Sequence, residues 1–178
     1  MSLERYQKGG ICPRLIFLLA LFLFLSASIT CTKRNSPTAS LSTDDPSYYV
    51  FDQRLKILDL TNETRADFGT GQLILDPYLN AVAQAYAEDM AVREFFSHMD
   101  PDGLTMLDRL NGAGIPFYAA GENIAWYPSA ETAILGWIES PGHYENLVRP
   151  MFNKIGIGVY NPDPDLASNY YYVQLFTN

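Results

Sequence analysis

The chain is poor in the residue types that most often cross-link or catalyse. Its 178 residues include only two cysteines and two histidines. Both cysteines, Cys12 and Cys31, lie within the first 31 residues, so no disulfide can form inside the rest of the chain. No HExxH motif is present, which argues against a zinc protease of that type. No repeat of solenoid or propeller period is found.

Positive charge is also scarce. The formal net charge is −8, and the first 31 residues are themselves basic, with Arg5, Lys8 and Arg14 against Glu4. The remainder therefore carries a charge of about −10, and an acidic domain repels phosphate backbones and anionic lipid surfaces. We expect no nucleic-acid partner.

The apolar run from Leu15 to Leu25 is too short for a comfortable transmembrane helix, which needs about 20 residues. It follows a basic segment and precedes small residues, the arrangement of a secretory signal peptide. We therefore predict a leader over residues 1–31 and an exported protein. An uncleaved membrane anchor is the alternative.

Cys31 stands between this leader and a polar stretch, residues 32–47, that we interpret as a flexible tether. A cysteine at such a junction is the position at which a bacterial lipoprotein is acylated. The preceding residues differ from a typical lipobox at Ser28 and Thr30. We predict a lipoprotein of the cell envelope, held to the membrane through Cys31. The alternative is cleavage after Ser28 and release as a secreted protein.

Helical periodicity dominates the first half of the remaining chain. A helix is predicted from Tyr48 to near Gly69, and a second one begins at Pro77 after the N-cap residue Asp76. The second helix places one broad apolar stripe on a single face, namely Leu79, Val82, Ala83, Tyr86, Ala87 and Met90.

Shorter elements follow. Thr105 is expected to cap a short helix that ends at Gly112. Ser129 is expected to cap a further helix, whose core residues would be Ala130, Ala133, Ile134, Trp137 and Ile138. Pro141 and Gly142 are expected to end that helix, before another over 143–148. Strands are predicted over 122–126, 154–160 and 169–177. Residues 48–178 should therefore form one α+β domain, with helices flanking an antiparallel sheet of at least three strands.

The two histidines, His98 and His143, both lie in irregular segments. Loops on a rigid scaffold often carry functional residues, and the predicted strand contains Glu122. We expect the three side chains to share one cleft. The alternative is that each histidine has a purely structural role.

Several motifs resemble the CAP superfamily, in the bacterial branch of the SCP-like extracellular domains. They are Gly121-Glu122-Asn123-Ile124, Trp137-x-x-Ser140-Pro141-Gly142-His143, Phe96-Ser97-His98, Leu60-x-Asn62-x-x-Arg65-x-x-x-Gly69 and Tyr172-Val173-Gln174-x-Phe176. The resemblance covers residues 48–178. It implies an α-β-α sandwich, with a central, mainly antiparallel sheet flanked by helices. It also implies a large cleft where two histidines and two acidic residues meet, and where some members bind zinc or another divalent metal.

Carried over position by position, the metal ligands would be His98 and His143, and the first acid Glu122. Eukaryotic members place the second acid where this chain has Ser140. The neighbouring Glu139 is a candidate, although it points about 100° away on a helix. Asn123 is expected to support the cleft by hydrogen bonds to backbone near it. Arg65 is expected to support it as a structural ion-pair or carbonyl-binding residue rather than by chemistry.

Two functions agree with these residues. The first is a binding module whose cleft takes a small molecule, a divalent metal, a lipid or an envelope component. The second is a metal-dependent hydrolase in which His98, Glu122 and His143 would be catalytic, with Glu122 as general base to a metal-bound water. The sequence favours the binding module.

Overall fold

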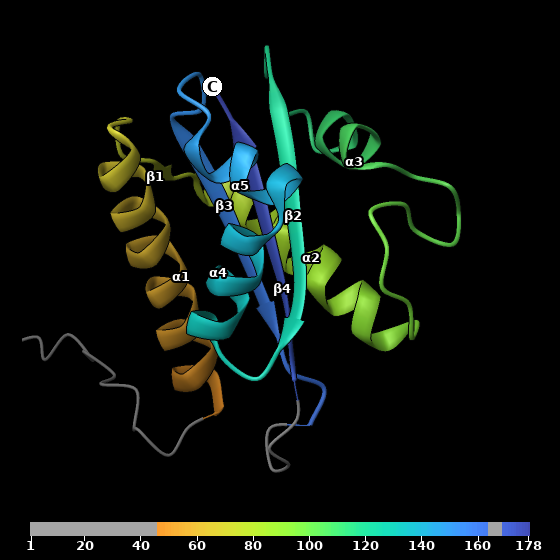
Figure 1. The fold of residues 1–178 in the computed structure, drawn as a ribbon. Coiled ribbons are helices and arrows are strands. Elements are labelled where there is room, and N and C mark those ends of the chain that lie inside the picture. Colours follow the sequence, from red (N-terminus) through yellow and green to blue (C-terminus); the bar gives the residue numbers. More distant parts are fainter. Residues whose placement is uncertain (1–45, 164–168) are drawn as a thin grey trace, which may run out of the picture. The chain divides into compact units, whose positions relative to one another are not determined.

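The computed structural model describes residues 46–163 and 169–178, all within one compact unit, Ala39–Asn178. The predicted leader with Cys31 lies outside the described residues, as does the predicted tether up to residue 45. The last two tether positions belong to the first helix. Figure 1 shows the described elements: α1 (Pro46–Phe68), β1 (Ile74–Leu75), α2 (Pro77–Val92), α3 (Met106–Gly112), β2 (Ala120–Tyr127), α4 (Ala130–Glu139), α5 (Pro141–Val148), β3 (Lys154–Tyr160) and β4 (Tyr170–Thr177).

The helix boundaries follow from capping residues. The Asp76 carboxylate accepts hydrogen bonds from two backbone N–H groups in the first turn of α2. Thr105 forms a reciprocal capping box at α3, and Ser129 forms another at α4. α1 ends where Gly69 adopts a left-handed φ of 84°. The four predicted helices that these residues delimit are confirmed.

One helix boundary was predicted wrongly. Pro141 and Gly142 were expected to lie between two helices, but Pro141 is the first residue of α5. Proline suits this position because the first N–H of a helix has no partner within the helix. Ser140 ends α4 and begins α5, so the two helices follow each other without a loop.

The core stripe of α4 is also narrower than predicted. Ala130, Ala133, Ile134 and Trp137 are buried, whereas Ile138 is 38% exposed. Each residue turns about 100° around a helix, so Ile138 lies beyond the edge of the stripe that ends at Trp137.

The sheet has the strand order β1-β3-β4-β2. β2 pairs with β4 and β4 with β3 in antiparallel directions, as predicted, whereas the two-residue β1 runs parallel to β3. β1 was not predicted, since two residues show no periodicity. β2 is an edge strand, with α5 beside it.

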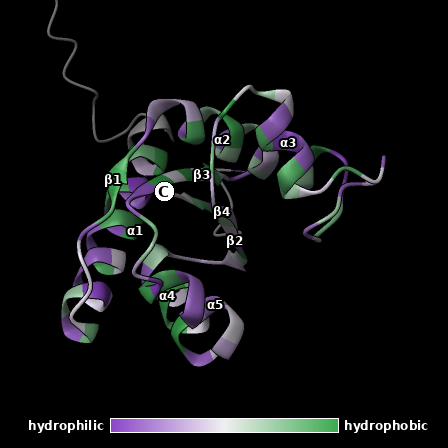
Figure 2. Cartoon of the chain, turned by 90° about the horizontal axis from the view of Figure 1, so that it is seen from above, coloured by the Kyte–Doolittle hydropathy of each residue, from purple (hydrophilic) through white to green (hydrophobic). Residues whose placement is uncertain are grey.

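Helices cover both faces of the sheet (Figures 1 and 2). Alternate residues of β4 point to opposite faces. Val173 and Leu175 pack with α2, and Tyr172 and Phe176 pack with α1, α4 and α5. Figure 2 shows α2 on one side of the strands and α4 and α5 on the other. The predicted α-β-α sandwich is therefore confirmed.

β1 pairs only with the first two residues of β3. Further along β3, side-chain amides of α2 bind its backbone groups. Asn80 accepts a hydrogen bond from the Ile157 N–H at 2.7 Å. One turn later, Gln84 accepts from the Val159 N–H at 3.1 Å and donates to the Val159 carbonyl at 2.9 Å. α2 thereby satisfies backbone groups that a neighbouring strand would otherwise bind.

Two glycines of β3 permit this close approach. A Cβ atom at Gly156 would lie 2.3 Å from the Leu79 backbone, and one at Gly158 would lie 2.1 Å from the Ala83 carbonyl oxygen. Both positions therefore require the absence of a side chain, so that the helix can lie directly on the strand.

Among the described residues, no helix is both long and apolar enough to cross a bilayer.

Candidate functional site

The candidate site lies at the β2 edge of the sheet. Glu122 is on β2 and shares the α2 face of the strand with Ile124. His98 belongs to the loop that follows α2, and His143 belongs to the first turn of α5 in the other layer. The three residues come from separate elements, so only the tertiary fold brings them together.

Glu122 forms two charge-assisted contacts. Its Oε1 lies 2.8 Å from His98 Nδ1, and its Oε2 accepts a hydrogen bond from Arg109 at 2.6 Å. The Glu122 side chain is only 4% exposed, whereas that of His98 is 55% exposed. An ionised carboxylate only accepts hydrogen bonds, so we infer that His98 Nδ1 carries the proton shared with Glu122.

Arg109 and Tyr86 are site residues that the sequence did not indicate. The guanidinium carbon of Arg109 lies 3.3 Å from the centre of the Tyr86 ring, a cation–π contact. Burial raises the pKa of Tyr86 to about 12, so its hydroxyl stays protonated and donates to the Ser97 carbonyl at 2.6 Å. Tyr86 thus supports Arg109 and holds the loop next to His98. Its place in a core stripe concealed this role.

The His143 ring faces that of His98, with the ring centres 6.3 Å apart and the planes inclined by 40°. Burial, followed by the charge of His98, lowers the pKa of His143 below its ordinary value of 6.5. His143 is therefore neutral at neutral pH, and its ring can accept a hydrogen bond or bind a metal ion.

A buried polar network fixes the backbone under these side chains. Asn123, fully buried, donates to the His143 carbonyl at 3.2 Å and to the Gln174 side chain at 3.1 Å. Gln174 in turn donates to Thr61 of α1 at 2.8 Å. Asn146 donates to the Asn123 side chain at 3.0 Å and to the Glu122 carbonyl at 3.2 Å. The amides join α5 to β2, so the network holds His143 and Glu122 in a fixed relation.

Arg65 has the supporting role expected of it, at a distance from the imidazoles. Its side chain is buried and donates to the carbonyls of Gly71, Leu147, Arg149 and Phe152. These bonds attach α1 to the segment that follows α5.

Glu139 forms no hydrogen bond or ion pair with His98, Glu122 or His143 in the described part of the chain. It is the exposed last residue of α4. The described site therefore contains one acidic residue, Glu122, beside the two imidazoles.

A hollow of about 410 Å³ adjoins the site. His98, Glu122 and Met99 line it together with the start of α3, through Thr105, Met106 and Leu107. His143 does not line this hollow, although its ring faces His98. The accessible surface beside the pair therefore combines polar groups with methionine and leucine side chains.

The donor set suits an open metal site better than a closed one. In the described residues, no group of three or more His, Cys, Asp or Glu side chains is arranged to hold a metal ion. Glu122 has both oxygens engaged, which leaves the imidazoles of His98 and His143 as the available donors. Rings that share one ion have centres roughly 5–6 Å apart, close to the observed 6.3 Å. A carboxylate behind a ligating imidazole is a frequent arrangement in metal sites.

The sequence motifs acquire structural roles at this edge. A Cβ atom at Gly121 would lie 2.9 Å from the Asn146 side chain and 3.1 Å from the Phe152 ring, so a larger residue there would displace both side chains. The Trp137 indole donates to the Ile124 carbonyl at 2.9 Å and thereby attaches α4 to the β2 edge. Gly121 and Trp137 thus hold the site together, while Glu122 and His143 of the same motifs supply its functional groups.

The family model of the cysteine-rich secretory proteins, CAP, matches residues 58–176. This chain belongs to the CAP family. Its CAP domain is 32% identical over 133 residues to the protein YkwD of Bacillus subtilis, with 74% of this chain and 49% of YkwD covered. The resemblance drawn from the motifs is thus confirmed.

Solved structures of CAP domains share the fold. An extracellular SCP-domain protein of Bacillus anthracis superposes with a TM-score of 0.68 at 32% identity, covering 78% of this chain and 44% of that one. An outer surface protein of Borrelia burgdorferi gives a TM-score of 0.65 at 23% identity, covering 71% and 92%. The chain spans less than half the length of both Bacillus proteins.

Proposed function

We propose that this CAP protein is exported, is anchored in the envelope by a lipid on Cys31, and binds a ligand in the cleft formed by His98, Glu122 and His143. The ligand class is a divalent metal, a lipid or another envelope component. The observation that carries the proposal is the His98–Glu122 hydrogen bond with the His143 ring opposite it. Such a pair holds the His98 ring in one orientation beside an accessible hollow.

Binding is a better interpretation of the cleft than hydrolysis by the mechanism with Glu122 as base. A general base needs a free lone pair within reach of the attacking water. Both Glu122 oxygens already accept hydrogen bonds from cationic or imidazole donors, and the side chain is almost fully buried. Glu122 is therefore suited to orient His98 and not to accept a proton from water.

A metal ion in the cleft would be held by His98 and His143, with water completing the coordination. The bound ion would supply a Lewis acid with open positions. Glu122 would orient the His98 ring, and Arg109 would balance the charge of Glu122.

Calorimetric titration of residues 39–178 with zinc tests this part of the proposal. We expect binding by the parent domain, loss of at least tenfold in affinity in His98→Ala and in His143→Ala, and a loss of about tenfold or more in Glu122→Gln. Glu139→Gln is the matched control and should bind as the parent does, because Glu139 is exposed and forms no hydrogen bond or ion pair with the described site residues. Absence of binding in a folded parent, or loss in only one histidine variant, would reject the shared site.

Export and anchoring rest on the leader and on Cys31, with support from the extracellular SCP-domain protein of B. anthracis. Mass spectrometry of the full-length protein expressed in a bacterial host should find an N-terminal peptide that begins with an acylated Cys31. Globomycin should block its processing, and Cys31→Ser should abolish the acyl mass. A mature chain that begins at Ile29 would contradict the anchor and leave a secreted protein.

A further inference from the structure

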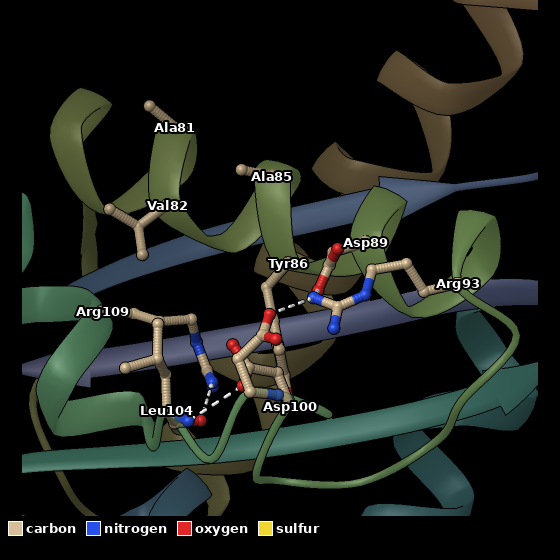
Figure 3. Close-up of a pocket in the computed structure, with 10 residues that line it drawn as sticks. Ala81, Val82, Ala85, Tyr86, Asp89, Arg93, Asp100, Leu104 and Arg109 are labelled. Atoms are coloured by element: carbon tan, nitrogen blue, oxygen red, sulfur yellow. Dashed lines mark hydrogen bonds and ion pairs between the residues drawn. The ribbon is translucent and has the colours of Figure 1, made fainter.

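A second and larger hollow lies away from the histidines, on the outer side of α2. It measures about 600 Å³ and is bounded by α2, by the loop over residues 100–104 and by α3. Figure 3 shows Ala81, Val82 and Ala85 along one wall, with Leu104 and Arg109 across from them. Pockets of about 300–1,000 Å³ are the usual size for small-molecule sites.

The small side chains of α2 create the space. Ala81 and Ala85 are exposed and stand one turn apart on the same helix face, so the wall between them is smooth and apolar. Tyr86 and Arg109 form the part nearest the His98–Glu122 pair. His98, Glu122 and His143 do not line this hollow.

Four of the five charged groups that line the hollow are already paired. Arg93 binds Asp102 at 2.8 Å and Asp89 at 3.5 Å. Arg109 is paired with Glu122 outside the hollow at 2.6 Å. Asp100 is then the charged group on the lining that forms no salt bridge among the described residues, although its charge acts on Arg93.

Asp100 is 8% exposed, and only one of its two carboxylate oxygens is engaged. Oδ1 accepts hydrogen bonds from the backbone N–H groups of Asp102 and Leu104, at 2.9 and 2.8 Å. In the described residues, the other oxygen accepts no hydrogen bond. This oxygen is not among the buried polar atoms that lack a partner, so it is open to solvent and can accept a hydrogen bond from a ligand in the hollow.

We propose that this hollow binds a small organic ammonium compound. The apolar body of the ligand lies against Ala81, Val82 and Ala85, and its ammonium group donates to the free oxygen of Asp100. The negative charge of Asp100 favours a cation over a carboxylate or phosphate. This site is separate from the proposed cleft and does not depend on the two histidines.

Hexylammonium is a suitable probe, titrated into residues 39–178 and followed by two-dimensional amide NMR. We expect saturable shifts that centre on Ala81, Ala85 and Leu104, and much weaker binding of hexan-1-ol, which has the same chain without the charge. Asp100→Asn should weaken binding about tenfold, the loss of one charged hydrogen bond. Asparagine keeps the acceptor for the two loop N–H groups, so the loop should stay folded.

Two further variants locate the site. Ala85→Trp fills the hollow from an exposed helix position and should abolish binding, whereas His143→Ala should bind hexylammonium as the parent does. Equal binding of hexan-1-ol, an unchanged affinity in Asp100→Asn, or no binding to the parent would overturn the proposal. A loss in His143→Ala together with an unchanged Ala85→Trp would assign the amine to the histidine cleft instead, which also overturns it.

Discussion

Gly158→Ala should destabilise the domain by about 3 kcal/mol, a large part of the stability of a domain of this size. The added methyl group would stand 2.1 Å from the Ala83 carbonyl oxygen, and the atoms it meets belong to the α2 backbone. Backbone cannot turn aside as a flexible side chain can, so α2 would have to move away from β3. That movement would also lengthen the hydrogen bonds between Gln84 and Val159. Urea unfolding followed by circular dichroism measures the effect.

Gly142→Ala is the matched control for this substitution. Nothing lies within 4 Å of a Cβ atom at Gly142, which belongs to α5, and alanine is the better helix former. The stability of this variant should be unchanged or slightly higher. If Gly158→Ala were as stable as the parent, the close packing of α2 on β3 would be wrong.

Arg65→Met should cost about 3–5 kcal/mol of unfolding free energy. Methionine fills a similar volume but leaves four carbonyls, those of Gly71, Leu147, Arg149 and Phe152, without the donor that satisfies them. Arg65→Lys should recover only a part of this stability, because an ammonium cannot reach the same set of acceptors in one plane. Urea unfolding of the three proteins gives the comparison.

The control for Arg65 lies on the same helix. Lys56→Met removes an exposed ion pair with Glu131, whose partners are 3.6 Å apart and about half exposed. Such pairs contribute little, so we expect a change within about 0.5 kcal/mol. A similarly small change in Arg65→Met would refute the structural role of the buried guanidinium.

The helices and the sheet could be predicted because their signals are local. Asp76, Thr105 and Ser129 are the N-cap residues at which α2, α3 and α4 begin. Gly69 ends α1 by its left-handed backbone. The alternating residues of β4 mark its two buried faces. The errors were local as well: the helix start at Pro141 was interpreted as a helix end, since proline favours both positions.

The candidate site was predictable only in part. His98, Glu122 and His143 were singled out because the chain contains just two histidines and because a family motif carries the glutamate. Nothing in the sequence marked Arg109, which lies in the last turn of a short helix where a basic residue usually has a capping role. Asn146 was missed because its partners Asn123 and Glu122 are more than twenty positions away in the sequence.

The sequence by itself determined the α+β class, the helix boundaries marked by caps and by Gly69, the absence of disulfides in the domain and the identity of the two imidazoles. These properties depend on residue type and on short-range periodicity. The tertiary structure alone decided that Glu122 lies between His98 and Arg109, that Glu139 forms no hydrogen bond or ion pair with them in the described residues, and that one Asp100 oxygen stays without a hydrogen bond beside a second hollow. These depend on how α2, α3 and α5 pack around the β2 edge, and packing joins residues whose separation in sequence carries no signal.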